Sequence, residues 1–258
     1  MARVLVIVPF AFEEHGLAKR RAQLAKVNLG AEIEFDYKPV RGGPANFDSY
    51  HDWLLADLAM LEVGLEAQVD GYDAVCIDTT SDSGVNALRS VLDIPVIGPG
   101  KASYLMALML GRRFAVLTQW DPWIPEAEKT LVEYGLMDKC VAIESINMPP
   151  DMENLLGGKE EEVFPLLLAA GMRCVEKGAD AICLGSTTMH EAAGYLNEHL
   201  PVPVIDPGPL TYKMAELVLG LGLSHSRTAY LKPNTPKPEL IHAMLDAAAS
   251  LEGSFGKS

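Results

Sequence analysis

Residues 71–80 read Gly-Tyr-Asp-Ala-Val-Cys-Ile-Asp-Thr-Thr, and residues 178–187 read Gly-Ala-Asp-Ala-Ile-Cys-Leu-Gly-Ser-Thr. The two stretches lie 107 positions apart. Further along, Pro95-Val-Ile-Gly-Pro99 matches Pro203-Val-Ile-Asp-Pro207 at an offset of 108, and residues 3–8 resemble residues 113–118. Chance explains one such pairing but not an ordered series, so the matches indicate a duplicated structural unit.

Each copy alternates short β-branched runs with longer helical stretches. We expect strands near 3–9, 31–36, 73–78 and 95–98, and again near 113–118, 140–146, 179–185 and 203–206. Helical patterns cover 52–69, 101–110, 159–176, 209–221 and 238–251. Apolar strands flanked by helices are typical of parallel sheets covered on both faces.

The predicted fold is therefore α/β, with two pseudo-symmetric, doubly wound parallel-sheet (Rossmann-like) domains. The first domain comprises residues 1–99 with 209–258, and the second comprises residues 100–208. Ligands of open α/β sheets bind at the carboxyl ends of strands. We accordingly expect the active site in the cleft between the two domains.

Bulk composition narrows the classes of partner. The formal net charge of −14 disfavours nucleic acid and acidic membrane surfaces. No apolar run reaches the roughly 18 residues that a bilayer requires, and residues 4–8 are typical of a first strand rather than a signal peptide. No Gly-rich phosphate loop follows that strand, so we expect no dinucleotide or nucleoside triphosphate. We expect no cofactor of any other kind either.

The chain has four cysteines: Cys76, Cys140, Cys174 and Cys183. They form no Cys-x-x-Cys pair, and no His/Cys cluster has the spacing of metal ligands. We expect no metal site. We also expect the thiols to be free and the protein to be cytoplasmic. A small-molecule substrate is the remaining class of partner.

Hydroxyl-rich turns end the two matching strands. The first contains Thr79, Thr80 and Ser81, and the second contains Ser186, Thr187 and Thr188. A turn that enters a helix offers unpaired backbone N–H groups and a partial positive charge, which suit a carboxylate or an oxyanion. Either turn alone is also typical of an ordinary helix N-cap. Their equivalent positions in a duplicated fold favour a shared ligand site.

The chain resembles the aspartate/glutamate/hydantoin racemase superfamily, most closely its hydantoin and allantoin racemase branch. The resemblance rests on the duplicated strand–turn–helix pattern and on residues 82–84, 113–118, 185–189 and 203–207. It implies a catalytic cysteine in each turn, at the positions of Thr79 and Ser186. It also implies substrate contacts from the loop that contains Pro9 and Phe10, and assembly into homo-oligomers. We expect further substrate contacts from Thr118, at the equivalent place in the second copy, and from Thr80, Ser81, Thr187 and Thr188 in the two turns.

Neither of the two catalytic cysteine positions holds a cysteine in this chain. A thiol ionises near pH 8.5, whereas an alcohol is closer to water, with a pKa of about 15.7. The difference is roughly 7 units, or about 10 kcal/mol, and a helix N-terminus contributes on the order of 1 kcal/mol. Cys76 and Cys183 lie three residues earlier, on the opposite face of each strand, and are expected to be buried.

The acid–base groups nearest the turns are Asp78 and His190. Asp78 directly precedes Thr79 and corresponds to Gly185 in the second copy, which breaks the pseudo-symmetry. It suits proton transfer and loop capping equally well. His190 follows Ser186 by four residues, so it is positioned to act as its general base or to lie at the surface.

Three functions fit these residues. The first is a racemase or isomerase acting on a small carboxylate or a cyclic amide, with a non-thiol acid/base arrangement. The second is a decarboxylase or C–N hydrolase that uses Ser186 with His190 or Asp78. The third is a catalytically silent carboxylate-binding protein.

Overall fold

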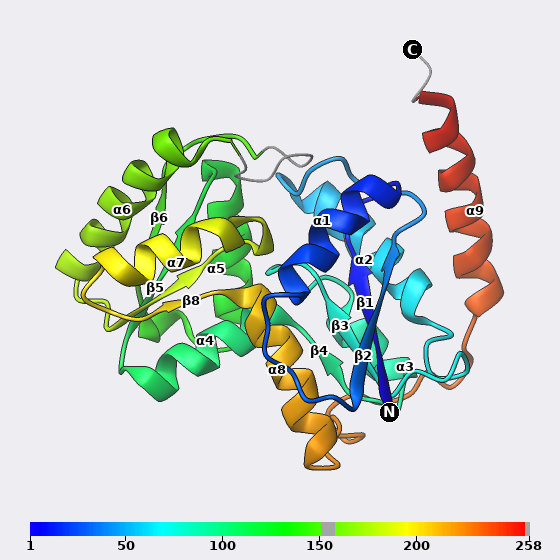
Figure 1. The fold of residues 1–258 in the computed structure, drawn as a ribbon. Coiled ribbons are helices and arrows are strands. Elements are labelled where there is room, and N and C mark those ends of the chain that lie inside the picture. Colours follow the sequence, from blue (N-terminus) through cyan, green and yellow to red (C-terminus); the bar gives the residue numbers. More distant parts are fainter. Residues whose placement is uncertain (151–157, 256–258) are drawn as a thin grey trace. The chain divides into compact units, whose positions relative to one another are not determined.

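The computed structural model describes residues 1–150 and 158–255, and these form two four-stranded parallel sheets (Figure 1). The first sheet has the order β2-β1-β3-β4 and the second β6-β5-β7-β8. The strands are β1 (Ala2–Val8), β2 (Ile33–Pro39), β3 (Ala74–Ile77), β4 (Val96–Ile97), β5 (Phe114–Thr118), β6 (Cys140–Ser145), β7 (Ala181–Leu184) and β8 (Val204–Ile205). The order is the same in both copies, so the predicted duplicated α/β fold is confirmed.

Helices connect the strands throughout the described residues. They are α1 (Glu14–Leu24), α2 (Tyr50–Gly64), α3 (Val85–Val91), α4 (Pro99–Leu110), α5 (Ile124–Glu133), α6 (Glu160–Glu176), α7 (His190–His199), α8 (Pro207–Gly220) and α9 (Pro238–Phe255). Short 3₁₀ helices occur at η1 (Asp121–Trp123), η2 (Met137–Lys139) and η3 (Thr187–Met189). The helix expected over 52–69 ends at Gly64, because the amides of Leu65 and Ala67 bond to carbonyls three residues back.

The chain divides into two compact units. The first contains Met1–Asp78, Ser83–Gly98 and the chain from Thr211 on, and the second contains Thr79–Asp82 and Pro99–Leu210. The units differ from the predicted domains chiefly in that residues 79–82 belong with the second one. Both hydroxyl-rich turns are therefore parts of the second unit.

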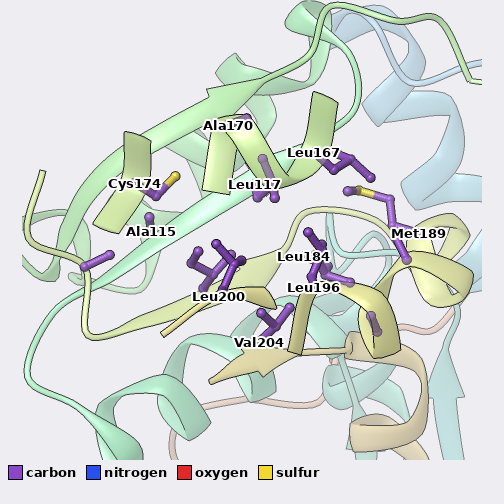
Figure 2. Close-up of a cluster of buried hydrophobic side chains, with 14 of the residues drawn as sticks. Ala115, Leu117, Leu167, Ala170, Cys174, Leu184, Met189, Leu196, Leu200 and Val204 are labelled. Carbon is purple, nitrogen blue, oxygen red and sulfur yellow. The ribbon is translucent and has the colours of Figure 1, made fainter. Parts of the chain in front are cut away.

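Strand β5 shows how the second sheet is covered on both faces. Ala115 and Leu117 point to the face covered by α6 and α7, where Leu167 of α6 packs near them (Figure 2). Phe114 and Val116 point to the opposite face, which α4 and α5 cover. All four β5 side chains are fully buried. Both faces are dry, so the strand is apolar throughout rather than alternating.

Strand β1 has the same role in the first sheet. Leu5 and Ile7 face α2 and α3, together with Leu245 of α9. Val4 and Val6 face α1 and α8. Within residues 1–150 and 158–255, no helix combines the length and the apolar character that crossing a membrane requires.

The helix that follows β4 and the helix that follows β8 each pack against the other sheet, not the sheet of the strand before them. Helix α4 follows β4 of the first sheet, but its Tyr104 and Ala107 pack in a core of the second sheet. Helix α8 follows β8 of the second sheet, but its Tyr212 and Ala215 pack in a core of the first. These residues match at the offset of 108, so the repeat seen in the sequence includes this exchange.

Candidate active site

The first turn begins where β3 ends and leads into α3. Its side chains Thr79 and Ser81 are both buried, and their hydroxyl oxygens lie 3.0 Å apart in a hydrogen bond. Asp82 has a φ of 53°, in the left-handed region that few residues other than glycine adopt. The chain therefore reverses tightly at Asp82, directly after the hydroxyl pair.

Asp82 ties this turn to the start of α4. Its Oδ1 accepts a hydrogen bond from the Gly100 amide at 2.8 Å, and its Oδ2 accepts from the Lys101 amide at 2.8 Å and from the Tyr134 hydroxyl at 2.6 Å. Two otherwise unpaired N–H groups of the helix N-terminus are satisfied in this way. Asp82 thereby fixes the end of the turn against the start of α4.

The second turn begins where β7 ends and leads through η3 into α7. The Ser186 hydroxyl accepts a hydrogen bond from the Thr188 amide at 3.2 Å and lies 2.8 Å from the Thr188 hydroxyl. The two turns thus carry the same device, a hydroxyl pair two residues apart. Ser186, Thr187 and Thr188 are all buried.

A hydrogen bond joins the two turns directly. The Thr80 hydroxyl donates to the Gly185 carbonyl at 2.7 Å, across 105 positions of sequence. Gly185 lies against Thr118, because a Cβ at Gly185 would stand 3.0 Å from the Thr118 Cβ. The structure therefore brings together Thr79, Thr80, Ser81, Ser186, Thr187 and Thr188 in one unit.

Thr118 lies beneath the turns rather than in an open pocket. Its side chain is 1% exposed, and its Oγ1 has no hydrogen-bond partner among the described residues. It lines a small enclosed cavity with Thr80, Trp123, Glu126 and Gly185. The cavity has about 10 Å³ of room for a water centre, which is about one water molecule.

His190 is paired with an aspartate that the sequence did not bring to attention. Its Nδ1 is hydrogen-bonded to Oδ2 of Asp206, with side-chain exposures of 11% and 13%. Among the described residues the Ser186 hydroxyl bonds to Thr188 and not to His190, so the role of His190 as a base for Ser186 stays a prediction. The sequence could have pointed to Asp206 only because the first copy of the repeat has Gly98 at the equivalent position.

Asp78 belongs to the first unit and lies in an ion pair. Its Oδ2 is 3.5 Å from Nη1 of Arg20, and the two side chains are 3% and 2% exposed. Protonating Asp78 would leave a guanidinium charge buried without its counter-charge, which is costly. The pairing favours a charged, structural Asp78 over one that exchanges protons.

Pro9 and Phe10 also belong to the first unit, at the end of β1. Both are buried, and the Phe10 ring stacks on Phe47 with centroids 5.2 Å apart. The Phe12 ring also lies near the Phe10 ring, with centroids 5.5 Å apart. In this structure Phe10 is part of an aromatic cluster, and its contact with substrate stays a prediction.

The four thiols are all protonated at neutral pH. Cys76 and Cys183 are fully buried, and burial raises the pKa of each well above its usual value. Their Sγ atoms donate to the carbonyls of Thr211 and Ser103, which correspond at the repeat offset of 108. Burial also raises the pKa of Cys174, to about 12, and that of Cys140.

Comparison with known proteins places this geometry in a family. A family model described as Asp/Glu/Hydantoin racemase matches residues 15–215. The chain belongs to this family. The hydantoin racemase of Pseudomonas sp. (strain NS671) is 35% identical over 187 residues, covering 72% of this chain and 74% of that protein. The hydantoin racemase of Rhizobium meliloti is 31% identical over 191 residues, covering 71% and 76%.

A solved structure agrees with the family assignment. Allantoin racemase from Klebsiella pneumoniae superposes with a TM-score of 0.82 at 27% identity, covering 92% of this chain and 95% of that one. The Asp/Glu/hydantoin racemase resemblance expected from the residues is confirmed, and the protein is an enzyme of the racemase type.

Proposed function

We propose that this protein is a cofactor-independent racemase or isomerase that acts on a cyclic amide or a small carboxylate. The observation that carries the proposal is the pair of hydroxyl-rich turns joined by the Thr80–Gly185 hydrogen bond. Relatives named hydantoin racemase and allantoin racemase support a cyclic amide as the first substrate class to test.

The turns suit the charge that such a reaction develops. Removing the proton from a carbon next to an amide carbonyl puts negative charge on the carbonyl oxygen. Donors that are held in place before the reaction stabilise that charge without reorganising. Ser186 is held by Thr188, and Thr79 by Ser81. We assign these hydroxyls and the neighbouring N–H groups to the substrate's oxygens.

The proton carrier in this proposal is not a thiol. All four thiols have raised pKa values, and Cys76 and Cys183 are also fully buried. Of the two acid–base candidates, Asp78 is held by Arg20 in a buried ion pair. His190 is the remaining candidate base, because Asp206 holds one ring nitrogen and leaves the other to take up a proton.

The hydrolase alternative has less support. A nucleophilic serine needs a base within hydrogen-bond reach, and among the described residues no hydrogen bond joins the Ser186 hydroxyl to His190. The proposal also includes a cytoplasmic location, which the free cysteines support, and assembly into homo-oligomers, which the family resemblance implies.

Ser186→Ala is the direct test of the hydroxyl turns. We expect the rate of racemisation of a single enantiomer of a 5-substituted hydantoin, followed by polarimetry, to fall on the order of 10²–10³-fold, the usual loss for one oxyanion donor. Allantoin is the second substrate to assay.

Ser250→Ala is the matched control. Ser250 is an exposed α9 serine whose hydroxyl bonds to the Ala247 carbonyl, so that variant keeps the wild-type rate. Near-normal racemisation by Ser186→Ala would contradict the proposal. Binding of hydantoins by the wild type without turnover would instead identify a silent binding protein.

A further inference from the structure

His190 and Asp206 form a pair whose geometry is set by two helix starts. His190 is the first residue of α7, and Asp206 directly precedes α8. Asp206 uses Oδ1 to accept the Gly208 amide at 3.3 Å, within the first turn of α8, and Oδ2 to bond Nδ1 of His190. The Gly208 amide thus fixes the position of the carboxylate that bonds to the imidazole.

The pair determines which imidazole nitrogen carries the proton. An ionised carboxylate only accepts hydrogen bonds, so Nδ1 must be the donor and the neutral ring must be the Nδ1–H tautomer. Nε2 then carries the lone pair. Among the described residues Nε2 has no hydrogen-bond partner, and it is not one of the fully buried unpartnered atoms. The lone pair is therefore open to a ligand.

The pair occurs only once in the duplicated fold. At the repeat offsets, His190 corresponds to Ser83 and Asp206 to Gly98. His190 directly follows Thr187–Met189, the short helix that Ser186 caps. One copy of the strand–turn–helix unit therefore carries both a hydroxyl pair and an oriented base, whereas the other carries only the hydroxyl pair.

We propose that Asp206 is a positioning residue that holds His190 as a neutral imidazole with Nε2 as the proton acceptor. This inference rests on the proposed function. The carbon-bound proton moves to Nε2, and the C–H electron pair delocalises into the adjacent carbonyl, whose oxygen the hydroxyl turns hold. To invert the carbon, a water molecule donates a proton to its opposite face, the imidazolium gives its proton to the hydroxide that results, and Asp206 balances the charge in between.

Asp206→Ala and Asp206→Asn test the pair without relying on activity. In the wild type, long-range ¹H–¹⁵N correlation of the histidine rings should show His190 with a protonated Nδ1 and an unprotonated Nε2. His190→Ala identifies the signal by removing it. Asp206→Ala should lose the Nδ1–H tautomer. Asp206→Asn keeps one acceptor oxygen, which can stay on the Gly208 amide and hold the start of α8, but its NH2 group then faces Nδ1 and should also remove the Nδ1–H tautomer.

Kinetics then separate positioning from packing. We expect Asp206→Ala and Asp206→Asn each to lower kcat for a 5-substituted hydantoin at least about 100-fold, with KM changed less than about threefold. His199→Ala, an exposed α7 histidine, is the control and keeps both values.

An unchanged His190 tautomer in Asp206→Ala overturns the inference, as does an unchanged kcat. A different outcome is that Asp206→Ala shifts the tautomer but the wild type turns over neither hydantoins nor allantoin. That outcome overturns the proposed function and leaves the orientation of His190 by Asp206 in place.

Discussion

Gly100, at the start of α4, has almost no free space between itself and the first turn. A Cβ built at Gly100 would stand 2.2 Å from the Thr80 carbonyl oxygen and 3.2 Å from Oδ1 of Asp82. Backbone atoms cannot yield as a flexible side chain does, so a larger residue must move the turn or the start of α4. The glycine is therefore required by a close approach, although its φ is not in the left-handed region.

Gly100→Ala should lower the free energy of unfolding by about 3 kcal/mol, the upper part of the usual overpacking range. Urea unfolding followed by circular dichroism measures it. Gly194→Ala is the control, because Gly194 is exposed in α7 and a Cβ there meets nothing within 4 Å. That control should be stabilised by about 0.5–1 kcal/mol. Equal effects of the two substitutions would contradict the close approach.

At the scale of elements, Glu144 links β6 to α6. Its carboxylate accepts hydrogen bonds from Arg173 at 3.0 Å and from Lys177 at 2.5 Å. Partial burial acts to raise the pKa of Glu144, but the two cations outweigh it and hold the pKa below its usual value. A carboxylate with a lowered pKa in the folded state stabilises the fold above its unfolded pKa, and that contribution is lost as the pH falls.

Glu144→Gln should therefore lower the free energy of unfolding by about 0.5–1 kcal/mol at pH 7, a modest value because Arg173 and Lys177 are about half exposed. The difference from wild type should shrink as the pH falls below the unfolded pKa of about 4.3 and through the lower folded pKa. Urea titrations at pH 7 and pH 3.5 measure both values. A difference that does not depend on pH would show that Glu144 acts by packing rather than by charge.

At the scale of the whole molecule, the repeat predicted most of the fold. Apolar runs that recur at offsets of 107–108 gave two sheets of the same strand order, because burial on both faces constrains sequence strongly. The pairings within the site were not predictable in the same way. Thr80 with Gly185, Asp82 with Tyr134, and His190 with Asp206 depend on side-chain directions across 105, 52 and 16 positions.

The site residues divide along the same line. Thr79 and Ser186 are predicted because they occupy equivalent positions in the repeat, and the burial of Cys76 and Cys183 could be predicted because strand side chains alternate. The ion pair of Asp78 with Arg20 has no such signal, because the two residues lie on different elements, 58 positions apart in sequence. Asp206 could be noticed only as a departure from the repeat.

Proton transfer without a thiol is tested most directly by hydrogen exchange at the carbon of a 5-substituted hydantoin in D₂O, before and after treating the native protein with iodoacetamide. Cys76 and Cys183 are buried and have raised pKa values, so they should escape alkylation, as mass spectrometry would show. We predict that deuterium enters the substrate at the same rate before and after treatment. Exchange that is lost together with an adduct on Cys76 or Cys183, or exchange that is absent from the untreated protein, would contradict this mechanism.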